Sequence, residues 1–160
     1  MEWTKHLLVD GYNIAHAWPT LRRVLEREGR EAVRDSLVAR LRVLHDFERV
    51  RVTIVFDGRG TDIAIERPTT HPTFSIVYTP GGMTADDLIE QLAAQAAEPA
   101  GVIVATADQA ERDTIEAAGA AALSPDQLLE WVERVERAQT AAVDQQRRQV
   151  ERQWRRGSSR

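Results

Sequence analysis

The sequence lacks several residue types and patterns on which common kinds of protein site depend. It contains no cysteine, so disulfides and thiolate-bound metals are excluded. Lys5 is its only lysine, and no Walker-type phosphate loop is present. A G-x-S-x-G nucleophile elbow and a histidine-rich zinc pattern are missing as well. Among the residues with reactive side chains, the carboxylates therefore offer the best candidate site.

Long apolar runs are also absent, which bears on where the protein works. No stretch approaches the roughly 18 apolar residues that a membrane helix needs. Residues 1–5 lack the basic segment, long apolar core and small-residue cleavage site of a signal peptide. We therefore expect no membrane partner, and a cytoplasmic location is the default prediction.

The remaining composition is that of an ordinary globular domain with an uneven distribution of charge. The chain has 160 residues, of which 42% are hydrophobic and 29% are charged, so it can bury a core. Residues 1–133 hold 13 basic and 22 acidic side chains, whereas residues 134–160 hold 8 and 3. An acidic body with a basic tail suits a carboxylate metal site beside a phosphate-binding arm, but also a solvated amphipathic helix.

Apolar segments alternate with helical patterns along the chain. Short apolar or β-branched runs predict strands at 6–10, 51–57, 73–79 and 101–106, with a fifth at 121–123. Apolar residues at helical spacing predict helices at 29–48, 84–97, 108–118 and from 125 to about 155. Residues 58–72 show no periodicity, and we expect a long mobile loop there.

The order of these elements predicts an α/β fold. Strands that alternate with helices and are apolar throughout are typical of a parallel sheet covered on both faces. No repeat and no linker suggests a second domain. We expect one domain, with its body in residues 1–124 and a long C-terminal helix with an arginine-rich tail in residues 125–160.

Four aspartates fall at the same predicted edge of the sheet. Asp10 and Asp57 end two strands, Asp108 follows another, and Asp86 lies in the first turn of a helix. Ligands of open parallel sheets bind outside the carboxyl ends of the strands. Clustered carboxylates repel one another unless a cation is present, and Mg²⁺ or Mn²⁺ prefer oxygen ligands. The four aspartates therefore predict a divalent-metal site that activates water for attack on a phosphodiester.

Each of these aspartates also has a structural alternative. Asp10 and Asp57 precede glycines and could open turns. Thr84 and Asp87 have the spacing of a capping box, which accounts for Asp87 but leaves Asp86 without a structural purpose. Asp86 is therefore the better candidate for the site, and Asp87 is expected to be structural.

The residues that follow the first and the fourth predicted strands are the most ambiguous. Asp108 and Glu111 have box-like spacing, so Asp108 could cap a helix, bind metal, or do both. Asn13 could be an N-cap, or its amide could hold a phosphate or a metal-bound water. Thr106 could end a strand or place its hydroxyl beside the metal. His16 is the histidine expected nearest the cleft, which is weak evidence for acid–base chemistry.

Six blocks of sequence, in order, resemble a known family. The sequence is similar to the YacP-like branch of the NYN domain family, which are nucleases of the PIN-like superfamily. The blocks span nearly the whole chain, and the first is the most specific. They are L-L-V-D-G-Y-N at 7–13, H-A-W-P at 16–19, V-F-D-G at 55–58, M-T-A-D-D-L-I-E at 83–90, V-A-T-A-D at 104–108 and W-R-R-G at 154–157.

The resemblance implies a fold, an activity and a set of residues. The fold would be a PIN-like three-layer α/β/α sandwich with a mostly parallel sheet. The activity would be metal-dependent endonucleolytic cleavage of RNA leaving a 5′-phosphate, with single-stranded messenger RNA as substrate and the ribosome as a partner. The catalytic set would be Asp10, Asp86 and Asp108, supported by Asn13 and Asp57.

The tail offers a second candidate contact with RNA. Five of its arginines could bind phosphates, and such binding would weaken steeply with salt. They could equally be a solvated helix face paired with Asp144 and Glu151. The arginines are Arg147, Arg148, Arg152, Arg155 and Arg156.

Three other kinds of protein compete with a metal-dependent nuclease. A signalling receiver domain would need paired acids at the first strand and a late lysine, and this chain has neither. A non-catalytic RNA- or ribosome-binding adaptor on the same fold stays open, although all four aspartates are present. A metal-independent nuclease that uses histidines would keep its activity in EDTA.

Overall fold

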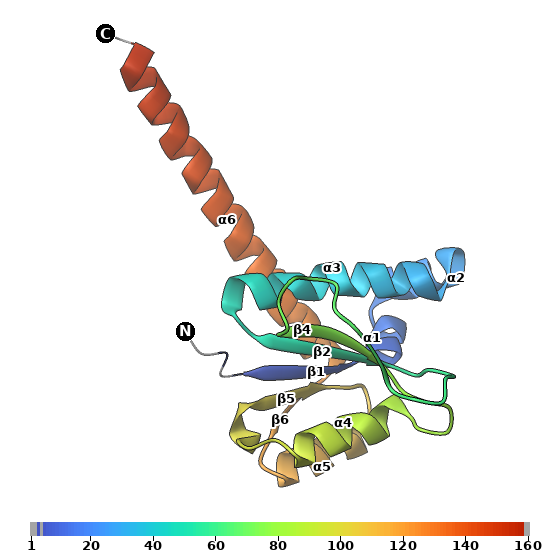
Figure 1. The fold of residues 1–160 in the computed structure, drawn as a ribbon. Coiled ribbons are helices and arrows are strands. Elements are labelled where there is room, and N and C mark those ends of the chain that lie inside the picture. The colour runs from blue at the N-terminus through green and yellow to red at the C-terminus, as the bar shows by residue number, and fades with distance from the viewer. Residues whose placement is uncertain (1–2, 4, 159–160) are drawn as a thin grey trace.

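The computed structural model describes Trp3 and residues 5–158, which build one six-stranded sheet (Figure 1). The strand order is β3-β4-β2-β1-β5-β6. Every neighbouring pair is parallel except β3 with β4, which is antiparallel. The strands are β1 (His6–Asp10), β2 (Arg51–Phe56), β3 (Ala64–Glu66), β4 (Phe74–Tyr78), β5 (Val102–Ala105) and β6 (Ala121–Leu123).

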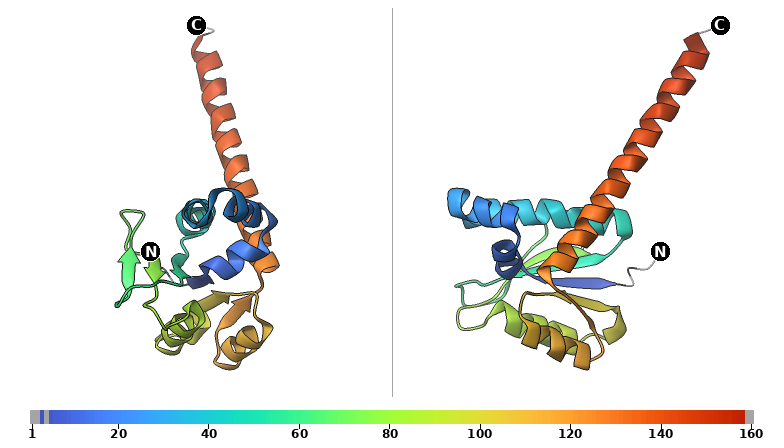
Figure 2. Two further views of the ribbon diagram at one scale, coloured as in Figure 1. Left: turned by 90° about the vertical axis from the view of Figure 1, so that its right-hand side faces the viewer. Right: turned by 180° about the vertical axis from the view of Figure 1, so that it is seen from behind.

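Helices cover both faces of this sheet. The first three helices and the start of the last one lie on one face, and α4 and α5 lie on the other (Figures 1 and 2). A short 3-10 turn, η1 (Pro99–Gly101), leads into β5. The helices are α1 (Gly11–Ala17), α2 (Pro19–Glu28), α3 (Arg30–Glu48), α4 (Ala85–Ala94), α5 (Gln109–Ala117) and α6 (Pro125–Ser158).

The central strands are largely apolar because each of their faces meets a separate core. Successive side chains of a strand point to opposite faces. Leu7 and Val9 accordingly join the core under α1, α2, α3 and α6, whereas Leu8 joins the core under α4 and α5. In β2, Ile54 and Val55 divide in the same way. The two cores hold the central strands rigidly, so the positions of their carboxyl ends are well determined.

Helix α6 belongs to the core only at its beginning. Leu128, Val132 and Val135 are buried, and the Trp18 indole donates a hydrogen bond of 2.8 Å to the Pro125 carbonyl. Beyond this part the helix projects away from the body (Figure 2), and Trp154 is 76% exposed. No helix in the described part of the chain is long and apolar enough to cross a membrane.

The predicted α/β class, the mostly parallel sheet and the long C-terminal helix are all confirmed. The expectation that residues 58–72 form one long loop without a strand was wrong, because β3 lies within it, while the mobility of the rest stays a prediction. All three residues of β3 are exposed, so neither face imposes the apolar alternation that would reveal a strand. Asn13 is not an N-cap either, since α1 begins at Gly11 directly after β1.

Candidate metal centre at the carboxyl edge of the sheet

Asp10 occupies the point in the sheet where a ligand site is most expected. It is the last residue of β1, which lies between β2 and β5. The strands β2 to β4 lie on one side of β1, and the later strands β5 and β6 lie on the other, so the strand order switches direction at β1. Ligands of open α/β sheets bind at such a switch in strand order. Asp10 precedes α1, but its side chain makes no capping hydrogen bond, and it is only 7% exposed. Its carboxyl group is therefore buried in the crevice without a structural purpose.

Residue 11 must be a glycine because of close packing, and not because a turn requires it. A Cβ atom at Gly11 would collide with the ring of Phe56 on the neighbouring strand. Gly11 begins α1 and does not have a positive φ. The alternative that Asp10 merely opens a turn therefore loses its support, and the glycine allows α1 to start close against β2.

Asp86 reaches the same crevice from the first turn of α4. Thr84 and Asp87 form the predicted capping box, with hydrogen bonds of 3.1 and 3.2 Å between each side chain and the other's backbone N–H. Asp87 is thus structural, as expected. Asp86 takes no part in the box, and its Oδ1 is buried without a hydrogen-bond partner.

Glu111 completes the group and was not predicted as a site residue. Asp108 caps α5 by accepting hydrogen bonds from the backbone of Ala110 and Glu111 at 2.9 and 3.3 Å. Glu111 instead accepts a 3.1 Å hydrogen bond from the Thr106 hydroxyl, is 5% exposed, and leaves its Oε1 buried without a partner. The sequence spacing suggested that Glu111 pairs with Asp108 in a capping box, so it was not considered as a metal ligand. Its burial without a basic partner is the signal for that role.

The three carboxyl groups converge closely enough to share one cation. One ligand oxygen each from Asp10, Asp86 and Glu111 lies within 4.8 Å of the others. An octahedral Mg²⁺ with bonds of ~2.1 Å separates its ligands by roughly 3–4 Å, so a small contraction would suffice. The two unpartnered oxygens are the kind of atom that a cation would satisfy. The residues present therefore fit a hard divalent ion such as Mg²⁺ or Mn²⁺.

The electrostatics of the metal-free group lead to the same conclusion. Burial, and next the adjacent Asp86 carboxyl, raise the pKa of Asp10 to about 8, with further contributions from Glu111 and Asp57. Burial followed by Asp86 raises the pKa of Glu111 to about 7. Within the described part of the chain, no ion pair involves these carboxyl groups. Without a cation the cluster must hold protons at neutral pH, which is unfavourable for a purely structural arrangement.

Asp57 and Asn13 shape the crevice and lie close to the three carboxylates. Asp57 accepts a 2.7 Å hydrogen bond from the backbone N–H of Ala85 and so fixes the start of α4. Asn13 accepts a 2.7 Å hydrogen bond from the N–H of Ala107, which ties α1 to the loop before α5. Both line a hollow of about 610 Å³ together with Asp10 and Asp86. Both residues thus have positioning contacts at the site, and a direct catalytic part for either stays a prediction.

Asp108 and Thr106 are held by local contacts beside the site. Asp108 acts as the N-cap of α5 and does not belong to the group of three carboxylates that could share an ion. Thr106 is fully buried, and its hydroxyl bridges the N–H of Asp108 and the carboxylate of Glu111. The structure therefore supports capping for Asp108, and metal binding by Asp108 stays a prediction.

The mouth of the hollow carries groups that could meet a polyanion. His16 lines it, as expected, and so does Arg30, which the sequence had not suggested. The guanidinium of Arg30 lies 5.0 Å from the centre of the Tyr12 ring, which itself packs on Phe56. The site thus combines a carboxylate floor with a cation and an aromatic ring at its entrance.

Comparisons with known proteins agree with this architecture. The model of the YacP-like NYN domain family matches residues 7–158. The chain is 36% identical over 132 residues to "Uncharacterized protein YacP" of Bacillus subtilis (strain 168), covering 82% of this chain and 76% of that protein.

Two crystal structures from Bacillus subtilis are similar in sequence and fold. The W164L mutant of Rae1 (YacP) superposes with a TM-score of 0.73 at 34% identity, covering 88% of this chain and 82% of the other. A second crystal structure of Rae1 (YacP) superposes with a TM-score of 0.66 at 31% identity, covering 96% of both chains.

Proposed function

The chain belongs to the YacP-like NYN domain family, which has the fold of PIN-like nucleases, and on this premise we propose that it is a metal-dependent endoribonuclease. The observation that carries the proposal is the group of Asp10, Asp86 and Glu111. It lies at the switch point of the sheet and has two buried oxygens without partners. A binding fold without catalysis has no need of such an unfavourable cluster.

The residues of the crevice divide the work between binding an ion and holding the substrate. Asp10, Asp86 and Glu111 would bind Mg²⁺ or Mn²⁺, while Asp57 and Thr106 keep α4 and Glu111 in place. The ion supplies activation of water and neutralises charge that develops on the phosphodiester. Arg30 lies at the mouth of the hollow, where its guanidinium can hold a phosphate oxygen of the incoming strand. Tyr12 beside it offers a ring face for a base.

The nature of the substrate follows from the family more than from the site. We propose single-stranded RNA as the substrate. More specifically, we propose messenger RNA that is bound to the ribosome. The arginines of α6 from Arg147 onward, which project away from the body, suit contact with a large polyanion. A non-catalytic RNA-binding adaptor on this fold remains the alternative, and the next experiment separates the two.

The test is to neutralise Asp10 and Asp86 without changing the shape of either side chain. Asp10→Asn and Asp86→Asn should each lower cleavage of a fluorescent single-stranded RNA in Mn²⁺ by roughly 1,000-fold or more, because the ion loses a charged ligand. Calorimetric titration with Mn²⁺ should show correspondingly weaker binding. EDTA should abolish cleavage by the unmodified protein.

Asp113→Asn is the matched control, because Asp113 is an exposed acid on α5 that accepts a hydrogen bond from the Gln109 side chain and does not belong to the carboxylate group. It should leave both cleavage and Mn²⁺ binding unchanged. If the Asp10 and Asp86 variants stay folded by circular dichroism and cleave as well as this control, the metal mechanism is wrong. If the unmodified protein binds RNA but never cleaves it in Mg²⁺ or Mn²⁺, the adaptor is the better description.

A further inference from the structure

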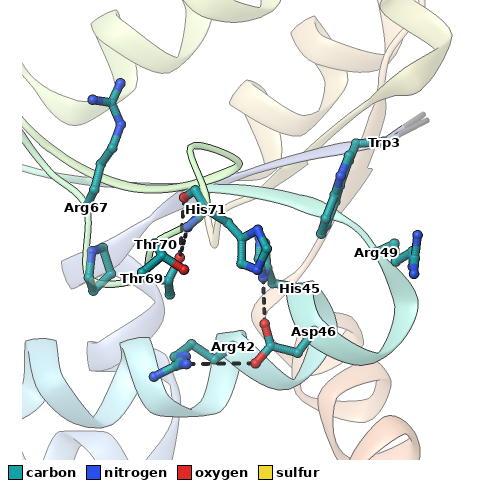
Figure 3. A pocket seen from close by; sticks show the side chains of 10 residues that line it. Trp3, Arg42, His45, Asp46, Arg49, Arg67, Thr69, Thr70 and His71 are labelled. Carbon is teal, nitrogen blue, oxygen red and sulfur yellow. Dashed lines mark hydrogen bonds and ion pairs between the residues drawn. The ribbon is translucent and has the colours of Figure 1, made fainter. Parts of the chain in front are cut away.

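A second hollow lies at the opposite edge of the sheet and is lined mainly by basic and aromatic side chains in place of carboxylates. It lies where β2 and β4 begin and α3 ends, and has a volume of about 920 Å³ (Figure 3). Volumes of this size are typical of ligand sites. The end of α3 and the segment of residues 67–71 form its walls, and Trp3 lies beside it. Nothing proposed above for the carboxylates involves these residues.

Arginine side chains dominate the charge of this hollow. Arg42, Arg49 and Arg67 line it, with Asp46 as the acid among its lining residues. Asp46 is already engaged: it pairs with His45 at 2.7 Å and more loosely with Arg42 at 3.9 Å. Arg49 and Arg67 form no ion pair or hydrogen bond with any part of the chain that the structure describes. Two guanidinium groups are thus available to an anion within a body that is acidic overall.

The floor of the hollow is an aromatic stack centred on the buried His45 ring. His45 is buried, and its two ring nitrogens contact Asp46 at 2.7 Å and the Thr73 hydroxyl at 2.8 Å. The Trp3 ring stacks on His45 with 4.6 Å between centroids and 25° between planes, and Figure 3 shows the two rings side by side. The His71 ring lies 5.8 Å from His45. Partly exposed rings next to guanidinium groups are what bases and phosphates of a single strand require.

The backbone at Arg49 gives independent support. Arg49 follows α3 with φ 56° and ψ 47°, and is the one non-glycine residue in the described part of the chain with a positive φ. Glycine is usual at this position of a helix, because a side chain there disfavours the left-handed conformation. Arginine at this position therefore carries a conformational cost. This cost indicates that the side chain serves binding and not the stability of the fold.

We propose that this hollow is a second binding site for single-stranded RNA, in which Arg49 and Arg67 hold phosphates and Trp3 and His71 offer ring faces to bases. The choice of RNA rests on the proposed function, whereas the anionic and aromatic character of the ligand rests on the hollow itself. The six residues of β2 separate the two edges by roughly 20 Å. A stacked strand that rises about 3.4 Å per nucleotide would cover this distance in ~6 nucleotides.

The test measures binding of a fluorescent 12-nucleotide single-stranded RNA to the full chain in EDTA. In the double variant Arg49→Gly and Arg67→Gln, the dependence of log K on log salt should become less steep by about 1.4, because two phosphate contacts are lost. Trp3→Ala should weaken binding about 5-fold or more while leaving the salt slope unchanged. Arg23→Gln, on the exposed surface of α2, is the matched control and should change neither quantity.

Stability separates a loss of contact from a loss of fold. Arg49→Gly alone should unfold at the same or a higher temperature, since glycine accepts the left-handed conformation. RNA affinity and salt slope equal to those of the Arg23 control in the double variant would overturn the proposal. Tighter binding of free adenosine monophosphate than of the 12-mer, lost in the same variant, would overturn RNA in favour of a small nucleotide.

The two proposals fail in different ways. Binding in EDTA does not depend on the catalytic ion, so a protein that cleaves RNA but binds equally without Arg49 and Arg67 disproves only the second site. A protein that loses RNA binding with these arginines but never cleaves disproves only the nuclease.

Discussion

The two edges of the sheet carry opposite charges, and we propose that both meet the same RNA strand. At the carboxyl edge, Asp10 and Glu111 are buried and Asp86 is half-buried, and the three carboxylates cannot meet phosphate without a cation between them. At the amino edge, Arg49 and Arg67 are exposed and can meet phosphate directly. A chelator should therefore disable the first edge and leave the second intact, whereas salt should weaken the second more. Chemistry and binding are separable because they occupy opposite ends of the same strands.

The largest effect in this comparison distinguishes Asp108, the N-cap of α5, from Glu111 in the first turn of that helix. Glu111→Gln should lower cleavage at least ~100-fold and weaken Mn²⁺ binding, because it removes one of three charged ligands. Asp108→Asn should keep both nearly unchanged, because asparagine caps a helix about as well as aspartate. Mn²⁺ titration together with cleavage of single-stranded RNA checks the pair. Equal losses in the two variants would return Asp108 to the metal site.

A smaller effect concerns stability without metal. The pKa of Asp10 is raised from 3.8 to about 8 in the folded protein, so the folded state holds a proton that the unfolded state has lost. Stability should therefore fall as pH rises from about 4 to about 8, by at most ~1.4 kcal/mol per pH unit for this group, and level off above. Glu111 acts in the same direction up to about pH 7.

Urea unfolding in EDTA at pH 5 and pH 8 measures this dependence. Asp10→Asn should be more stable than the unmodified protein at pH 8 and should lose less stability between the two pH values. Saturating Mn²⁺ should oppose the decline, since it favours the deprotonated carboxylates. A stability that rises from pH 5 to pH 8 in EDTA would contradict the burial of an uncompensated cluster.

The smallest expected effect on the fold comes from the projecting arm. Truncation after Thr140 should leave the melting temperature nearly unchanged, because the buried residues of α6 end at Val135. If the tail arginines contact RNA, the salt dependence of binding should become less steep by up to about 3.5 for five phosphate contacts. Fluorescence anisotropy across a salt series measures this. An unchanged slope would assign the arginines to the solvated surface of the helix.

The elements that carry strong periodicity were predictable, and those with weak periodicity were not. The buried strands β1, β2, β4 and β5 and the helix α3 face apolar cores, which impose patterns on their sequences. β3 is exposed along its length and left no such pattern. The immediate start of α1 was also missed, because it depends on the approach of Gly11 to Phe56 across strands.

The sequence by itself determined the parallel α/β class, the edge where Asp10 and Asp86 meet, and the capping role of Asp87. Each of these follows from local spacing, because strand ends and helix caps are set by neighbouring residues. Only the tertiary structure decided that Glu111 turns from its helix cap toward the aspartates, and that Trp3, Arg49 and Arg67 share one hollow. Such groupings join residues that are far apart in the chain. Only the packing of the two helix layers on the sheet brings these residues together.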